Sequence, residues 1–327
     1  MAGCLGEQGQ PESNSFRASV DRALVHRQAV SEVFLTGVRP SGNMTYTLWA
    51  QWPRWHVFYG SWNGRFDSAI VVETLRQLTV LVAHTQLDVP LDRHFLMPEM
   101  SVSMTGGARP DPARPADVTV KASVSELRTG GQGLAALRVA AVFQANGQKI
   151  AEGTARARIV APDAYNRLRS RRRTSNGHRN ISPVAPEKVG HTSAWNVVLG
   201  ESDAPACWPL HVDVSNPILF DHPLDHVPGV LLIEAVRQAL RLALPDPALD
   251  LATFEASFIS MAELDDEATV VLESLSLGPA SAAAAVSVKA NGTVLMRTVA
   301  GFRPGQPTFQ PRSALPGPEG PRGTPRA

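Results

Sequence analysis

The sequence predicts an α+β protein made of two repeats, in each of which an antiparallel sheet wraps around one long apolar helix. The motif Glu-x-x-Arg-Gln occurs twice, at residues 73–77 and 234–238, and each copy stands inside an otherwise apolar run. Each half also ends in Ala-Asn-Gly between alternating β-type runs, which is typical of a two-residue hairpin. A chain of 327 residues suits two domains of roughly 130 to 150 residues with tails.

Composition narrows the class of protein. Hydrophobic residues make up 43% of the chain and charged residues 19%, which indicates a globular protein with a substantial core and excludes disorder throughout. The net charge of +1 gives no general attraction to nucleic acid or membrane, so neither is expected as a partner. Cys4 and Cys207 are the only cysteines, which excludes a disulfide framework and suits a reducing cytoplasm. We expect neither export nor a membrane anchor, since no leader pattern and no long apolar run occur.

The two halves correspond in order along the chain. Segment Val25–Gly37 parallels Val189–Glu201, and the stretch beginning at Phe58 parallels the one beginning at Phe220. The runs "SAIVVETLRQLTVLVAH" and "GVLLIEAVRQALRLAL" are apolar on most sides, which predicts two largely buried helices. Glutamate and arginine are costly in such helices unless they are paired or used, so the repeated motif marks a candidate site.

Composition shifts give the expected domain boundaries. The run "RSRRRTSNGHRNISPVAPEK" is interpreted as a solvated linker, with a phosphate or nucleic-acid patch as the alternative. The tail after Phe302 is rich in proline and glycine, which predicts disorder. The expected organisation is a flexible segment over 1–21, a first domain over 22–162, a basic linker over 163–188, a second domain over 189–303 and a disordered tail over 304–327.

Three stretches, "FDHPLDHVPGVLLIEAVRQAL", "AQWPRWHVFYG" and "ETLRQ", resemble the A-factor biosynthesis hotdog family, and the resemblance covers roughly Leu24 to Phe302. It implies a tandem (double) hotdog fold. It also implies an acyltransferase that moves a β-ketoacyl group from acyl carrier protein to the hydroxyl of dihydroxyacetone phosphate, in biosynthesis of γ-butyrolactone-type or related butenolide or furan signalling molecules. No metal or nucleotide cofactor is expected. A non-catalytic module that binds acyl ligands or γ-butyrolactones, and a hotdog thioesterase or dehydratase, are the alternatives.

The second half also resembles the hotdog dehydratases of fatty-acid synthesis. In those enzymes a Pro-Gly-Val-Leu segment precedes a helix that carries a catalytic glutamate followed four residues later by glutamine. This chain departs from the dehydratase pattern in two ways. It carries an arginine, Arg237 or Arg76, where dehydratases have a small residue. It also lacks a histidine at the dehydratase spacing, since His222 and His226 are too close to the glutamate. Simple dehydration is therefore not expected, and the added cation indicates an anionic substrate. The matching residues are Pro228, Gly229, Val230, Leu231, Glu234 and Gln238.

Glu234 is the candidate general base for the attacking alcohol, provided that partial burial raises its pKa toward neutrality. Arg237, three residues later on the same helical face, would instead hold Glu234 ionised, so we expect Arg237 to engage the substrate phosphate with its planar fork. An intrahelical ion pair without a catalytic role is the alternative. Gly229 heads the helix, where N–H groups could face the thioester carbonyl, although an ordinary helix entry accounts for it too. Glu73 belongs to a second pseudo-symmetric site or is structural.

The remaining expectations concern positioning groups. The loop histidines invite a metal site with Asp221 and Asp225, but further ligands at a recognised spacing are missing, so no metal is expected. His56 is interpreted as a packed polar group rather than a catalyst. The fused pair is expected to be a monomer with an internal pseudo-dimer, or a homodimer. Residues that line either an acyl tunnel or the core are Trp52, Trp55, Phe58 and Tyr59. The substrate-binding candidates are Arg237, Arg76, His222, His226, Gln238 and Gln77.

Overall fold

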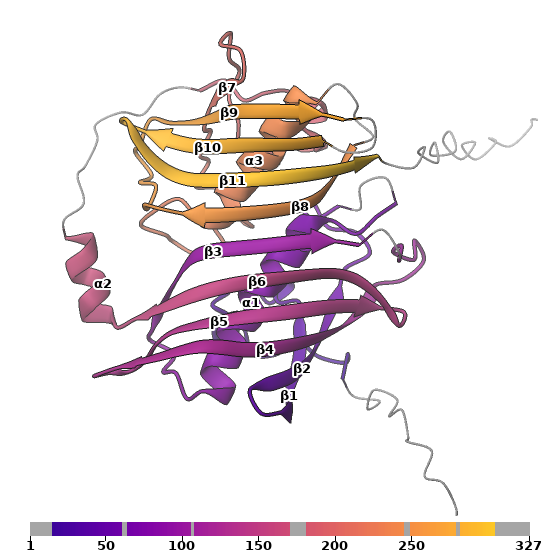
Figure 1. Ribbon diagram of the computed structural model, residues 1–327, viewed down its shortest axis with the longest axis vertical. Coiled ribbons are helices and arrows are strands. Elements are labelled where there is room, and N and C mark those ends of the chain that lie inside the picture. The colour runs from indigo at the N-terminus through magenta and orange to yellow at the C-terminus, as the bar shows by residue number, and fades with distance from the viewer. Residues whose placement is uncertain are drawn as a thin grey trace, which may run out of the picture.

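In the computed structural model the two halves lie side by side and share one curved sheet, with a long helix of each half against the same face (Figure 1). The structure describes residues 15–60, 64–105, 108–170, 181–244, 249–278 and 282–304. The strands of the two repeats therefore form one continuous sheet, in agreement with the tandem architecture that the sequence predicts.

The sheet has 11 strands in the described residues, in the order β1-β2-β4-β5-β6-β3-β8-β11-β10-β9-β7, and every pair is antiparallel. The halves join where β3 pairs with β8, from Glu99 opposite Ser257 to Ser103 opposite Thr253. We call this pair the seam. The strands are β1 (Leu35–Gly42), β2 (Thr45–Trp52), β3 (His94–Met104), β4 (Ala116–Gly130), β5 (Gly133–Ala145), β6 (Gln148–Val160), β7 (Cys207–Pro209), β8 (Leu249–Phe258), β9 (Ala268–Leu277), β10 (Ala282–Ala290) and β11 (Thr293–Pro304).

Both Asn-Gly pairs form the hairpin turns that the sequence predicts. Asn146 and Gly147 have φ of 51° and 73° between β5 and β6, and Asn291 and Gly292 have φ of 50° and 76° between β10 and β11. Asparagine and glycine tolerate positive φ, and two such residues in succession match the twist of the flanking strands. These turns fix the register of the last hairpin in each half.

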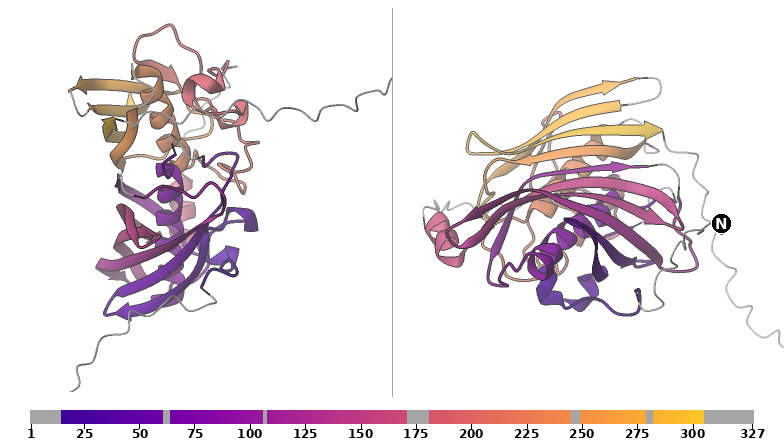
Figure 2. Two further views of the ribbon diagram at one scale, coloured as in Figure 1. Left: turned by 90° about the vertical axis from the view of Figure 1, so that its right-hand side faces the viewer. Right: turned by 60° about the horizontal axis from the view of Figure 1, so that its bottom comes forward.

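The central helices are α1 (Ser68–Gln86) and α3 (Gly229–Ala243), and the sheet curves around them (Figure 2). Helix α1 begins where the Asp67 carboxylate accepts the N–H of Ala69 at 2.9 Å, which satisfies a backbone donor that the helix leaves unpaired. Helix α3 follows Pro228, whose fixed φ suits a helix start. Both helices are apolar on most sides because each is covered by the sheet and by the other half.

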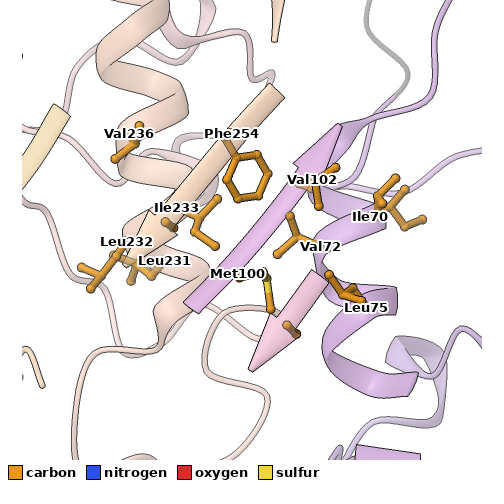
Figure 3. Packing of buried hydrophobic residues seen from close by; sticks show 14 of the residues in the cluster. Ile70, Val72, Leu75, Met100, Val102, Leu231, Leu232, Ile233, Val236 and Phe254 are labelled. Carbon is orange, nitrogen blue, oxygen red and sulfur yellow. The ribbon is translucent and has the colours of Figure 1, made fainter. Parts of the chain in front are cut away.

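The apolar core is continuous across the seam. Val72 of α1 and Ile233 of α3 are 1% and 5% exposed, and Figure 3 shows them on the two sides of the seam strands near Met100 and Phe254. Burying such side chains contributes roughly 1.5 to 3 kcal/mol each. The helices are therefore held against one shared core, and the polar groups that they carry occupy fixed positions.

The predicted linker over 163–188 is partly structured. Its first residues belong to a short helix, α2 (Pro162–Arg169), at the edge of Figure 1. Tyr165 donates to Asp225 at 2.8 Å, and Arg169 pairs with Asp225 at 2.8 Å and with Glu263 at 2.6 Å. These contacts dock the start of the linker on the second half. Residues 171–180, the first 14 residues and the tail from 305 lie outside the described residues, and no described helix is long and apolar enough to cross a membrane.

Gly153 of β6 tests the packing of α1 on the sheet. A Cβ at this position would lie 2.9 Å from the carbonyl oxygen of Ser101 and 3.0 Å from a methyl group of Leu75. We expect Gly153→Val to lower the free energy of unfolding in urea by about 1 to 3 kcal/mol, because overpacking forces backbone shifts. Gly131→Ala is the matched control, since no atom lies within 4 Å of a Cβ there. Equal stability of the two variants would contradict this account.

Candidate active site

Two buried polar clusters, one in each half, are centred on the glutamates of the repeated motif. Glu73 of α1 is 0% exposed and Glu234 of α3 is 2% exposed. We call the groups around them the Glu73 cluster and the Glu234 cluster. Buried carboxylates must be paired and hydrogen-bonded to stay ionised, so the partners of each glutamate decide what it can do.

The glutamine of each motif anchors backbone. Gln77 donates to the carbonyl of Glu32 at 2.7 Å and accepts the N–H of Phe34 at 3.0 Å. Gln238 makes the equivalent bonds in the second half, to the carbonyl of Asn196 at 2.6 Å and from the N–H of Val198 at 3.0 Å.

Both amides also donate to the motif glutamate, and both side chains are fully buried. We expected Gln77 and Gln238 to contact the substrate. The structure instead places them as internal anchors, because backbone groups and the motif glutamate already use their hydrogen-bonding groups.

Two arginines saturate the Glu73 cluster. Arg27, just after the short helix η1 (Arg22–Val25), reaches Glu73 at 2.8 Å. Arg76 donates to both carboxylate oxygens, at 2.8 and 3.0 Å, and also to the carbonyl of Val25 at 3.1 Å. The Arg27 guanidinium further donates to the carbonyl of Ile218 in the other half, at 3.2 Å. This cluster is a closed ion-pair network.

The Glu234 cluster has a histidine where the first cluster has Arg27. His191 lies just after the short helix η3 (Pro186–Val189), and its Nε2 is 2.8 Å from Glu234 Oε1. Arg237 donates from Nη1 to the other oxygen of Glu234 at 2.7 Å. Its Nη2 donates to Asp67 at 2.7 Å. The second glutamate therefore pairs with one guanidinium group and one imidazole ring.

The pKa values of both glutamates are lowered. Burial by itself opposes ionisation of Glu73, but Arg27 and Arg76 lower its pKa to about 2. Burial likewise opposes ionisation of Glu234, whereas Arg237 and the hydrogen bond from His191 lower its pKa to about 2. The expectation that burial raises the pKa of Glu234 toward neutrality is therefore wrong, because its neighbours outweigh desolvation.

The Glu234 cluster extends across the boundary between the halves. Asn196, at the end of the short helix η4 (Ala194–Asn196), donates to the carbonyl of Val57 at 2.5 Å, and its amide lies 3.4 Å from His191 Nδ1. The ring of Phe58 lies 5.6 Å from that of His191. Together with the bond between Arg237 and Asp67, these contacts make the cluster a joint product of both halves.

A cleft adjoins the Glu234 cluster at Arg237. It lies between the start of α1, the C-terminal half of α3 and the ends of seam strands, and its volume is about 820 Å³ including the part open to solvent. Arg65 and Arg241 line it beside Arg237, while Phe66 and Leu240 belong to an apolar wall. A ligand with both an anionic group and an apolar part would match this lining.

Other predicted residues lie apart from the Glu234 cluster in the contacts of the described residues. His226 contacts Asp225 at 2.7 Å and Tyr165 at 3.4 Å. His222 lies 3.5 Å from Asp221. Gly229 packs against Phe258, and a Cβ there would lie 3.1 Å from the phenyl ring. The helix start that reaches the cluster is that of α1 at Asp67, rather than that of α3 at Gly229.

The aromatic stretch between β2 and α1 packs the loop. His56 accepts the N–H groups of Phe58 and Tyr59 at 3.1 Å each and contacts Glu32 at 3.2 Å, which confirms it as a packed polar group. Trp52 is 2% exposed and donates to a buried threonine on α1, whereas Trp55 is 80% exposed. Trp52 therefore belongs to the core, and the four candidate tunnel residues Trp52, Trp55, Phe58 and Tyr59 are not among the residues that line the cleft described above.

No group of three or more histidine, cysteine or acidic side chains within the described ranges is arranged to hold a metal ion. The loop pair His222 and His226 therefore gains no third ligand of these types there.

Sequence reasoning missed Arg27, His191 and Asp67 as members of the clusters. The repeat contained a signal for the first two, because Arg27 and His191 occupy the same place in the parallel segments Val25–Gly37 and Val189–Glu201. Nothing in the sequence pattern connected Asp67 to Arg237, since the two are joined only by the packing of α1 against the second half.

The lowered glutamate pKa values predict acid sensitivity. A carboxylate with a folded pKa of about 2 and an ordinary value of 4.5 contributes stability that is present above pH 4.5. This contribution is lost as the pH falls from about 4.5 to about 2, at roughly 1.4 kcal/mol per pH unit for each group. Urea denaturation between pH 6 and pH 2.5 measures the slope.

In the same experiment, Glu73→Gln should reduce stability at pH 7 by about 3 to 5 kcal/mol, because it leaves Arg27 and Arg76 buried without a counter-charge. It should also flatten the acid slope. The exposed Glu187→Gln is the control. Wild-type stability and slope in Glu73→Gln would refute the buried ion-pair account.

Comparison with solved structures supports the fold alone. A structure described as a putative oleoyl thioesterase from Lactobacillus plantarum aligns with a TM-score of 0.51 at 12% identity, and the alignment covers 82% of this chain and 99% of that one. At this identity the likeness identifies the double hotdog architecture and says nothing of the reaction.

Comparison of sequences identifies the family. A 2-oxo-3-(phosphooxy)propyl 3-oxoalkanoate synthase from Streptomyces virginiae is 38% identical over 259 residues, which cover 79% of this chain and 88% of the relative. The Streptomyces coelicolor protein of that name is 33% identical over 276 residues, which cover 84% and 87%. The family model described as the A-factor biosynthesis hotdog domain matches residues 9–161 and 173–300. The chain belongs to the A-factor biosynthesis hotdog domain family.

Proposed function

We propose that this chain is an acyltransferase that joins a β-ketoacyl group to the free hydroxyl of dihydroxyacetone phosphate, as in biosynthesis of γ-butyrolactone-type signalling molecules. The name of the Streptomyces relatives, 2-oxo-3-(phosphooxy)propyl 3-oxoalkanoate synthase, describes the ester that this reaction yields. The single structural observation that carries the proposal is the contact of His191 with the ionised Glu234, beside a cleft with basic and apolar walls.

The reaction needs a base and no redox step. The acceptor hydroxyl oxygen attacks the thioester carbonyl carbon, a C–O bond forms, and the C–S bond breaks. The proton of the hydroxyl finally resides on the departing thiol. A positioned base that takes this proton during attack and returns it to the thiolate balances the reaction.

His191 suits the role of base better than Glu234. An ionised carboxylate only accepts hydrogen bonds, so the 2.8 Å contact assigns a proton to His191 Nε2. The lone pair of Nδ1 faces the Asn196 amide at 3.4 Å, a long contact that the acceptor hydroxyl replaces when it binds. The imidazolium that forms when Nδ1 takes the hydroxyl proton is stabilised by the negative charge of Glu234. Glu234, with its pKa of about 2, acts as the orienting and charge-stabilising partner. Arg237 and Gln238 hold Glu234 in place.

The donor and the setting complete the proposal. We infer from the sequence resemblance that the donor is a β-ketoacyl thioester of acyl carrier protein. We infer a cytoplasmic setting because a chain with two cysteines suits a reducing compartment. We further propose a monomer with an internal pseudo-dimer, or a homodimer, because the Glu234 cluster takes groups from both halves of the chain.

We expect purified full-length protein, given β-ketoacyl carrier protein and dihydroxyacetone phosphate, to form the phosphorylated ester together with free carrier thiol, as measured by mass spectrometry. Turnover should fall about 10²- to 10⁴-fold in His191→Gln, because the base is lost. Glu234→Gln should cause a comparable loss, because the amide keeps the shape but not the charge. Circular dichroism melting checks that both variants fold.

His211→Gln is the matched control, because His211 approaches the Glu234 cluster through its backbone, whose N–H donates to the carbonyl of Val198 at 2.9 Å, and the substitution keeps that bond. Release of free β-keto acid without ester, whether or not the acceptor is present, would identify a thioesterase instead. Binding without any covalent product would identify a non-catalytic module. Near-wild-type turnover of folded His191→Gln would refute the assignment of the base.

A further inference from the structure

The cleft beside the Glu234 cluster carries an excess of basic groups. Three arginines, Arg65, Arg237 and Arg241, line it together with one aspartate, Asp67. Arg65 and Arg241 are half-buried, which limits screening of their charge by water. Helix α1 begins at the same place, and the start of a helix favours negative charge. An anionic ligand group therefore matches this end of the cleft.

Arg237 is committed to two carboxylates. Its Nη1 donates to Glu234 and its Nη2 to Asp67, both at 2.7 Å, and its side chain is 9% exposed. A phosphate that used these same N–H groups would have to displace a buried carboxylate. Such a displacement costs several kcal/mol for an ion left without a partner. Arg237 is therefore better placed to tie the two halves together than to serve as the main ligand of a substrate anion.

Comparison of the two helices explains why Arg237 can reach Asp67. In the first half, Arg76 binds both its own glutamate and the carbonyl of Val25. In the second half, the equivalent carbonyl, that of Val189, accepts from Arg241 at 2.7 Å instead. Arg241 lies about one turn beyond Arg237 on α3. This second arginine takes over the backbone anchor, so that Arg237 is released to cross the boundary between the halves.

The added cations occur at only one of the two pseudo-symmetric positions. At the position of Arg241 along the helix, α1 carries Val80. At the position of Arg65, before the helix start, the second half carries His226. The two halves have thus diverged in charge at the cleft, and both differences add an arginine to the side that holds Glu234 and His191.

We propose that Arg65 and Arg241 bind the phosphate monoester of the acceptor at the mouth of the cleft, while Arg237 serves as the internal tie between Glu234 and Asp67. The inference rests on the proposed function and changes its phosphate ligand from Arg237 to these two residues. Planar guanidinium groups suit a phosphate dianion because they can donate two parallel hydrogen bonds. The acceptor's three-carbon body then extends from the mouth toward the Glu234 cluster.

A phosphate in this cleft has two possible sources, the acceptor and the phosphopantetheine arm of the carrier-bound donor. The test therefore compares acceptors and donors that carry or lack phosphate. Dihydroxyacetone replaces dihydroxyacetone phosphate in one arm. A β-ketoacyl N-acetylcysteamine thioester, which has no phosphate, replaces the carrier-bound donor in the other. Apparent KM and kcat are measured for wild type, Arg65→Gln, Arg65→Lys and Arg241→Lys.

With dihydroxyacetone phosphate, Arg65→Gln should raise the acceptor KM about 10- to 100-fold with either donor, because a charge-assisted contact is lost. Reaction with dihydroxyacetone should change much less. Arg65→Lys should show a smaller loss that is greater with the phosphorylated acceptor, since an ammonium keeps the charge and loses the fork. Arg241→Lys should likewise lose more with the phosphorylated acceptor, beyond any loss common to both acceptors from the altered anchor on Val189. Arg297→Gln, on an exposed position of β11, is the matched control.

Calorimetric titration of dihydroxyacetone phosphate into the protein without donor gives a second measurement that needs no turnover, and Arg65→Gln should weaken this binding by a similar factor. Unchanged acceptor KM and binding in both folded Arg65 variants would overturn the inference even where wild type forms ester. A loss seen only with the carrier-bound donor would overturn it in favour of the phosphopantetheine arm. Absence of ester formation by wild type would refute the proposed function. The calorimetry separates that outcome from failure of the phosphate site, because it measures binding of the phosphorylated acceptor without turnover.

Discussion

An ionised carboxylate buried in the N-terminal half of each central helix is the constraint on which the rest of the structure depends. Burying such a charge is costly unless cations and hydrogen bonds surround it. Glu73 and Glu234 obtain these partners from the arginine and glutamine of their own helix and from a segment well before it. Because the glutamines also hold the backbone that leads into each half, satisfying the charge fixes how that segment runs over the helix.

Among the differences between the two clusters, the exchange of Arg27 for His191 bears most directly on the proposed chemistry. Arg27 and Arg76 enclose Glu73 with two permanent cations, so both described ion-pair partners of this glutamate are guanidinium groups. His191 replaces the first of these cations at Glu234. An imidazole held by a carboxylate can take a proton from a substrate and return it, and our proposal of a reactive site in the second half and an ion-pair anchor in the first rests on this difference.

The site also depends on the union of the two halves. Arg237 reaches Asp67, Asn196 reaches the carbonyl of Val57, and Arg27 reaches the carbonyl of Ile218. These bonds cross the same boundary that β3 and β8 close by pairing. The pairing of β3 with β8 therefore does more than join two domains. If the strands shifted along each other, Asp67 would move away from Arg237 and the charge around Glu234 would change. The strand pairing that stabilises the fold thus also holds the groups of the Glu234 cluster in place.

The sequence by itself determined the architecture and the two glutamates, because those signals are local. Helical burial, Asn-Gly turns and the spacing of Glu73 to Arg76 all depend on neighbours within a few residues. Only the tertiary structure decided that His191 lies against Glu234, that Asp67 meets Arg237, and that the pKa of Glu234 falls rather than rises. These contacts join segments distant in the chain, and the balance between desolvation and a nearby cation is set by a few ångströms that sequence spacing does not specify.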